Sequence, residues 1–98
     1  MQEWNGTYQL QAQTEIGPVV LTVTFVEENG ALTGTSDFYG SVVDLENGKV
    51  EGDTFTYQFW AVTNYGNYYL TVQGRREGDQ LTGTMNGGTY VTFTGSRV

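Results

Sequence analysis

The chain has 98 residues and a formal net charge of −7, with 11 acidic and 4 basic side chains and neither cysteine nor histidine. A chain of this length forms a small core, so we expect one domain over residues 1–98. The composition excludes disulfides, and it removes the usual metal ligand and the usual neutral-pH base. The acidic surface disfavours nucleic acid and anionic membranes. We therefore expect no cofactor, no metal, no nucleic-acid partner and no membrane partner.

Turn residues recur at short, even intervals, and the segments between them alternate between apolar and polar residues. Asn-Gly and Gly-Asp pairs supply the positive φ of tight hairpins, and the alternation is typical of antiparallel strands with one buried face. The pattern predicts eight strands, at residues 4–14, 18–28, 31–38, 41–51, 54–63, 68–76, 80–86 and 89–97. The inward faces are expected to carry Trp4, Gly6, Tyr8, Leu10 and Ala12; Val19, Leu21, Val23 and Phe25; Phe55, Tyr57, Phe59 and Ala61; and Tyr68, Leu70 and Val72.

The two halves of the chain match as an internal repeat, residues 1–49 and 50–98, with 15 identities in 49 ungapped pairs. The clearest match is the segment Leu-Thr-Gly-Thr, which occurs at residues 32–35 and again at 81–84. A repeat of this length is one supersecondary unit that cannot bury its apolar face alone. The sequence therefore predicts an all-β fold, a closed up-and-down antiparallel eight-stranded β-barrel built from two duplicated four-strand halves.

Strand 41–51 is the ambiguous one. The repeat pairs Val42 with Val91, which would turn Val42 inward, whereas the apolar alternation places Val43 and Leu45 inside. A slip of one residue exchanges the two faces of a strand, and a β-bulge at Asn47-Gly48 would produce it. We predict that Val43 and Leu45 lie inside.

These features resemble the calycin group of barrels, in particular short bacterial lipocalin-like domains with a repeated Leu-Thr-Gly-Thr hairpin. Trp4, near the start of the first strand, and Arg97, at the end of the last, resemble the pair that closes one barrel end in lipocalins, where the arginine packs over the indole. The segment 30–35, Gly-Ala-Leu-Thr-Gly-Thr, resembles bacterial avidins locally. The usual Gly-x-Trp order of lipocalins and the tryptophan cage of avidins are both missing. The resemblance implies a fold, since fold alone does not assign an activity.

The inward aromatic residues are the first candidate site. Rings beside residues without side chains, at Gly34, Gly74 and Gly83, frame a pocket for a small apolar or aromatic molecule. The alternative is that these rings fill the interior, because an eight-stranded barrel is barely wider than its own side chains. The candidate ligand-binding residues are Tyr8, Phe25, Phe38, Tyr57, Phe59 and Tyr68.

The outward face of strands 54–63 and 68–76 is the second candidate. Trp60, Val62 and Tyr69 stand where the first half carries Gln11, Gln13 and Val20, so the apolar residues occur on one side only. A hairpin turning at Tyr65-Gly66 would set Val62 opposite Tyr69 and Trp60 opposite Thr71. Exposed aromatic patches mark interfaces. This reading makes the chain an accessory or interaction domain with a filled core, and a homodimer is the expected assembly.

An acid–base site is the third candidate. Asp37 and Asp44 are expected almost opposite each other across a hairpin at Tyr39-Gly40, and paired carboxylates split their pKa values or hold a cation. The alternative is that Asp37 and Asp44 are a solvated pair of carboxylates without function. With neither histidine nor cysteine, an enzyme would be an isomerase or cyclase that uses tyrosine or aspartate in the lumen, so we expect a non-catalytic protein. Residues 1–4 do not resemble a signal peptide, and a secreted or periplasmic location would require a leader that had been removed.

Overall fold

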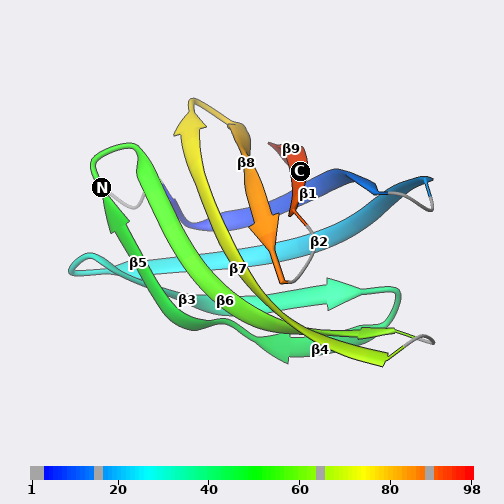
Figure 1. Ribbon diagram of the computed structural model, residues 1–98. Helices are drawn as coiled ribbons and strands as arrows, with labels where there is room; N and C mark the ends of the chain where they lie inside the picture. Colours follow the sequence, from blue (N-terminus) through cyan, green and yellow to red (C-terminus); the bar gives the residue numbers. More distant parts are fainter. Residues whose placement is uncertain (1–3, 15–16, 64–65, 88–89) are drawn as a thin grey trace.

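The computed structural model describes residues 4–14, 17–63, 66–87 and 90–98, and within these ranges the chain forms strands and no helix. The strands are β1 (Gly6–Thr14), β2 (Gly17–Glu28), β3 (Ala31–Phe38), β4 (Ser41–Asp44), β5 (Glu46–Glu51), β6 (Thr54–Thr63), β7 (Gly66–Glu77), β8 (Gln80–Asn86) and β9 (Tyr90–Arg97). All pairings are antiparallel, and the β1–β9 and β2–β3 pairings close the ring (Figure 1). β4 and β5 together are the fourth strand of the wall, so the predicted eight-stranded up-and-down barrel is confirmed. No helix capable of crossing a membrane occurs among these residues.

The fourth strand contains the bulge that the sequence predicts. The register runs from Thr35↔Asp44 to Ala31↔Lys49, so β4 and β5 carry one extra residue relative to β3. The same shift appears against β6, and Asn47 has a positive φ of 52°. Leu45 is buried, and Val43 and Val50 pack partly buried against the core on either side of the bulge. The prediction for Val43 and Leu45 is confirmed, and Val42 points outward.

Two-residue turns set the strand registers. Asn29-Gly30 and Tyr39-Gly40 have positive φ at both positions, the type I′ turn whose twist matches its flanking strands. Gly52 and Gly78 are the first turn residues of two further hairpins, each with φ 62°, as the type II′ turn requires. The expected turn residues Tyr65 and Gly88 lie outside the described residues, as does Thr89, the expected first residue of the last strand.

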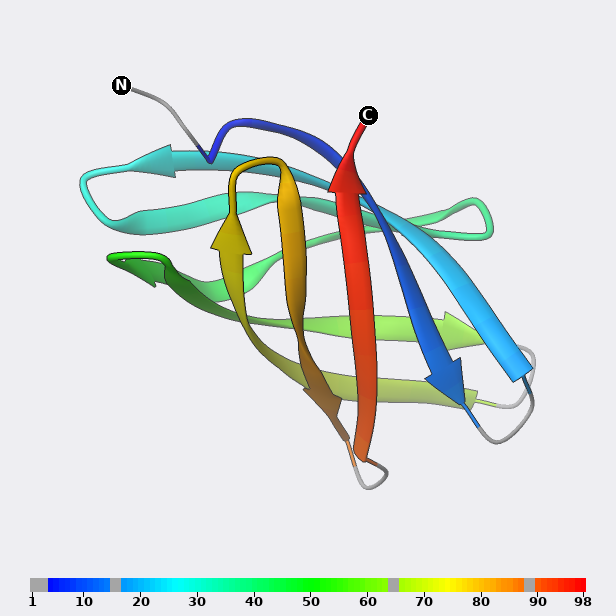
Figure 2. The same cartoon turned by 90° about the horizontal axis from the view of Figure 1, so that it is seen from above.

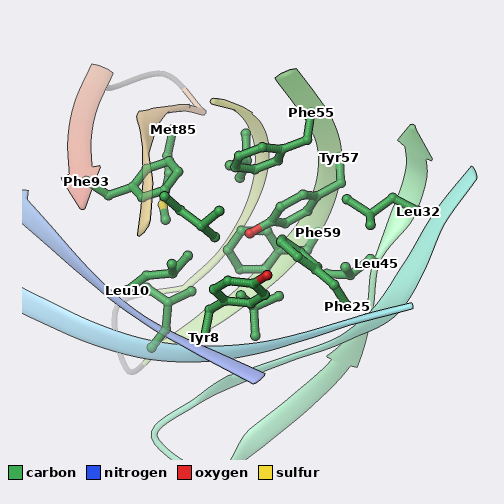
Figure 3. Packing of buried hydrophobic residues seen from close by; sticks show 14 of the residues in the cluster. Tyr8, Leu10, Phe25, Leu32, Leu45, Phe55, Tyr57, Phe59, Met85 and Phe93 are labelled. Atoms are coloured by element: carbon green, nitrogen blue, oxygen red, sulfur yellow. The ribbon is translucent and has the colours of Figure 1, made fainter. Parts of the chain in front are cut away.

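The inward faces meet in an interior filled with aromatic rings (Figure 3). The ring of Phe25 lies 5.3 Å from that of Tyr8, 5.7 Å from that of Phe55 and 5.6 Å from that of Tyr57, centroid to centroid. Phe59 continues the series, with its ring 6.0 Å from that of Tyr57. These distances are ordinary for packed aromatic pairs, so the rings are one another's neighbours.

The inward glycines permit close contact between strands. A Cβ on Gly34 would overlap the Thr24 carbonyl oxygen, and one on Gly83 would overlap the Gln73 carbonyl oxygen. At Gly74 a Cβ would come within 2.8 Å of the Phe55 ring. The expectation that these glycines frame a pocket is therefore wrong, because the space beside each one is filled by backbone or ring.

The barrel end that holds the three turns at 29–30, 52–53 and 78–79 is closed by Trp4, and we call it the closed end. Trp4 is buried, with its ring 5.5 Å from the Phe55 ring. The cation above its indole is Arg76, 5.1 Å away, whereas Arg97 lies 4.9 Å above the Tyr8 ring. Arg97 also donates to the Asn5 carbonyl and forms an ion pair of 2.9 Å with Asp79. The Trp4–Arg97 stacking implied by the lipocalin resemblance is thus replaced by Arg76 on Trp4.

Candidate functional site

Four of the six expected lumen residues are completely enclosed. Tyr8, Phe25, Tyr57 and Phe59 are buried, and Phe38 packs partly buried against the core. Tyr68 is 44% exposed, so the expectation that it lines the interior is wrong. Its position in the strand alternation is an inward one, but Tyr68 lies at the start of β7, two residues from the strand's first residue, where it pairs with Ala61.

Two hydroxyl groups are buried in this apolar interior with no hydrogen-bond partner among the described residues: those of Tyr57 and Ser36. Tyr8, which matches Tyr57 in the predicted repeat, differs because its hydroxyl donates to the Trp4 carbonyl at 3.3 Å. In Figure 3 the Tyr8 and Tyr57 hydroxyls both point toward the middle of the barrel. Burial raises the pKa of the Tyr57 phenol far above its usual range, so it remains a neutral donor at every physiological pH.

The outward residues Trp60, Val62 and Tyr69, which we call the Trp60 face, are held in a fixed arrangement. Trp60 is 47% exposed, Val62 is also exposed, and the indole lies 4.9 Å from the Tyr69 ring. The two aromatic residues are direct cross-strand partners, Trp60↔Tyr69. The expected pairs Val62 with Tyr69 and Trp60 with Thr71 are therefore wrong by two residues, because Thr63 pairs with Gly66 and the register is centred one residue earlier than expected.

Polar side chains fix the Tyr69 ring from the other side. Its hydroxyl donates to the Glu46 carboxylate at 2.9 Å and lies 3.3 Å from the Gln58 side-chain oxygen. That oxygen accepts a second hydrogen bond, from the Asn47 side-chain amide at 2.6 Å. The hydrogen bond to Glu46 is the main cause that raises the pKa of Tyr69. The bulged strand thus supports the aromatic pair, and the pair presents a preset surface.

The carboxylates Asp37 and Asp44 do not face each other. The two-residue turn at Tyr39-Gly40 pairs Asp37 with Val42 and Thr35 with Asp44, so the predicted juxtaposition is wrong. Asp37 accepts a hydrogen bond from the Gly40 N–H at 2.9 Å and thereby caps the turn. Among the described residues no three metal-ligating side chains cluster, and a shallow depression near the β5–β6 turn, lined by Lys49, Glu51, Thr54, Phe55 and Thr56, lies outside the lumen.

Sequence reasoning missed a break in the barrel wall between β4 and β6. Glu46 pairs with Gln58, and continuing that register would set Asp44 opposite Trp60 and Val42 opposite Val62. No such pairing occurs among the described residues, where β4 is hydrogen-bonded to β3 alone, although β4 and β6 still come within 8 Å of each other, Cα to Cα. Figure 2 shows the β3–β4 and β6–β7 hairpins diverging toward their turns. The sequence signal for this break was Val42, a valine that the apolar alternation leaves on the outward face. In the structure this side chain is 60% exposed.

Comparisons with known proteins give no match: no protein-family model, no curated protein and no solved structure is significantly similar to this chain. The barrel itself is consistent with a calycin-like fold.

Proposed function

We propose that the protein is a non-catalytic interaction domain that acts through the Trp60 face, on a calycin-like barrel with a filled core. The observation that carries the proposal is the exposed Trp60 packed on the half-buried Tyr69, whose hydroxyl is held in place by the hydrogen bond that it donates to Glu46. Tryptophan and tyrosine side chains with little remaining freedom lose little entropy on binding, and these residue types dominate binding energy at interfaces.

The packing of the interior supports this choice over a lumen ligand. The rings that were expected to surround a ligand contact one another, and Tyr8, Phe25 and Tyr57 are almost completely inaccessible to solvent. A ligand in that region would have to displace them, which is costly in a close-packed core. The exposed face requires no such rearrangement.

Native mass spectrometry of the protein and of Trp60→Gln tests the proposal. We expect the parent to form an assembly, with a second copy or with another chain, that Trp60→Gln loses while remaining folded. Val26→Gln is the control, because Val26 is an exposed apolar residue at the closed end. An assembly that survives Trp60→Gln, or a Trp60→Gln chain that fails to fold, contradicts the proposal.

A second candidate, a small apolar or aromatic molecule in the lumen, is favoured by the unpartnered hydroxyls of Tyr57 and Ser36. Buried polar groups almost always have a partner, and a bound carbonyl or ether oxygen would accept from the Tyr57 phenol. The same spectra test this candidate. A small-molecule mass that remains on the parent and is absent from Tyr57→Phe supports it, and a bare parent mass contradicts it.

A further inference from the structure

The break in the wall leaves backbone groups of β4 available for pairing. Leu45 donates its N–H to the Gly34 carbonyl at 3.0 Å, so Leu45 and Val43 direct their backbone groups toward β3. Because strand residues alternate, Val42 and Asp44 direct theirs away from β3, toward β6, which comes within 8 Å of β4, Cα to Cα, but is not paired with it among the described residues. We call these groups the β4 edge. An unpaired edge of this kind is a template for an added strand.

The side chains along this edge continue the Trp60 face. Val42 and Asp44 point outward, as Trp60 and Val62 do on β6, and Val42, Trp60 and Val62 are all exposed. A strand added at the β4 edge would place its outward side chains beside this apolar group. Its other side chains would point inward, toward the half-buried Val43.

The basic residues are segregated along the barrel, whereas acidic residues lie at both ends, six of them beside the closed-end turns: Glu27, Glu28, Glu51, Asp53, Glu77 and Asp79. Asp37, Asp44 and Glu46 lie on β3, β4 and β5, and Glu46 accepts a hydrogen bond from Tyr69 of the Trp60 face. All four basic residues of the chain lie toward the closed end: Lys49 pairs with Ala31 next to the 29–30 turn, Arg75 pairs with Thr54 next to the 52–53 turn, and Arg76 and Arg97 cover Trp4 and Tyr8. The β4 edge therefore carries uncompensated negative charge among the described residues.

We propose that the β4 edge binds an extended, basic segment of a partner protein as an added β-strand. Lysine or arginine would stand opposite Asp44, and an apolar residue opposite Val42. This inference rests on the proposed function and names the partner class of the same surface. The backbone hydrogen bonds supply affinity, and the carboxylates select the charge of the segment.

A second copy of the chain is a poor occupant of the edge. Pairing β4 with β4 of another copy across a twofold axis would bring the Asp44 carboxylates of the two chains close together. Like charges opposed across strands are destabilising. A basic segment instead converts this repulsion into attraction.

The probe is a fluorescein-labelled, acetylated nonapeptide of one-letter sequence KTVVKVVTK, which reads the same in both directions and so does not prejudge strand orientation. We expect saturable binding by fluorescence anisotropy, weakened at least about tenfold when salt rises from about 0.05 M to about 0.5 M. Two control peptides separate the contributions. ETVVEVVTE reverses the charge, and KTVVKVVTK with N-methyl groups on the amides of its odd-numbered residues blocks the backbone edge that would set lysine opposite Asp44. Neither is expected to bind measurably.

Three protein variants locate the site. Asp44→Lys is expected to weaken binding about tenfold or more, while Glu77→Lys, which makes the same change at an exposed closed-end residue, is expected to leave it unchanged. Val42→Pro removes an edge N–H and is expected to abolish binding, because proline is tolerated on an edge strand but cannot pair there. Circular dichroism establishes whether each variant is folded. If Val42→Pro does not fold, the peptide affinity of Asp44→Lys tests the site instead.

The outcomes separate this inference from the proposed function. One outcome would contradict the β4 edge and support the Trp60 face: Trp60→Gln loses peptide binding, Val42→Pro binds the peptide fully, and the N-methylated peptide binds the parent fully. Equal binding of KTVVKVVTK and ETVVEVVTE, or no binding of either, overturns the basic partner. A dimer that Asp44→Lys strengthens would identify a second copy as the occupant and also overturn it.

Discussion

Replacing Tyr57 with phenylalanine is expected to stabilise the barrel, whereas the same change at Tyr8 is expected to destabilise it. The two residues match in the predicted repeat, and both are fully buried. They differ in one respect, because the Tyr8 hydroxyl donates to the Trp4 carbonyl and the Tyr57 hydroxyl has no partner among the described residues. A buried hydroxyl without a partner costs about 1–3 kcal/mol of desolvation, whereas a typical hydrogen bond contributes about 1 kcal/mol.

Tyr57→Phe should therefore raise the free energy of unfolding by about 1 kcal/mol, after allowing for the small void that the oxygen leaves. Tyr8→Phe should lower it by about 1 kcal/mol, so the two variants should differ by about 2 kcal/mol. Urea unfolding followed by tryptophan fluorescence measures both. With a slope of about 1–2 kcal/mol per molar urea, the midpoints should separate by at least about 1 M in opposite directions from the parent.

An equal loss of stability in both variants would refute this reasoning. It would mean that the Tyr57 hydroxyl does have a partner, either a trapped water or a bound molecule. If the partner is a bound molecule, the lumen candidate gains support. The mass of that molecule should then be present in the native mass spectrum of the parent and absent from that of Tyr57→Phe.

The remaining predictions concern pH, a glycine and a cation. Because burial raises the pKa of the Tyr57 phenol, the folded state keeps a proton that the unfolded state releases above about pH 10. The free energy of unfolding should thus not lose this contribution below about pH 10 and should fall above that pH. The fall should be less steep in Tyr57→Phe than in the parent. Gly34→Ala, at φ 137° against a neighbouring backbone carbonyl, should lower the free energy of unfolding by about 3 kcal/mol or prevent folding. Gly40→Ala, at φ 91° with open space around it, should lower it by only about 1 kcal/mol, and thermal unfolding compares the two variants. Arg76→Gln should cost about 1 kcal/mol and alter Trp4 fluorescence through loss of the cation above its indole, and unchanged Trp4 emission would contradict that contact.

The barrel could be predicted because strand alternation and turn chemistry are local properties. Val43 and Leu45 were placed correctly from apolar alternation, and the Asn47-Gly48 bulge from the conflict between that alternation and the repeat. A positive φ at Asn47 is something the residue type itself favours. The all-β class followed from the same signals.

The errors arise where geometry depends on loop length or on distant strands. Asp37 and Asp44 were misplaced although their turn was predicted, because a turn at Tyr39-Gly40 pairs Phe38 with Ser41 and therefore Asp37 with Val42. The Trp60 partner was misassigned because Thr63 pairs with Gly66, which centres that hairpin one residue earlier than expected. Arg76 reaches Trp4 only after the barrel closes, which sequence spacing does not encode. The exposure of Tyr68 and the break beside β4 depend on where the wall ends, a property of the whole barrel.

Amide hydrogen exchange at Val42 and Asp44, measured by NMR with and without KTVVKVVTK, tests the open β4 edge most directly. Fast exchange of both amides in the free protein, beside a protected Leu45 amide, and slow exchange once the peptide is present are the expected results. Protection of Val42 and Asp44 in the free protein would show that the wall is closed there, and exchange unaffected by saturating peptide would place the binding elsewhere.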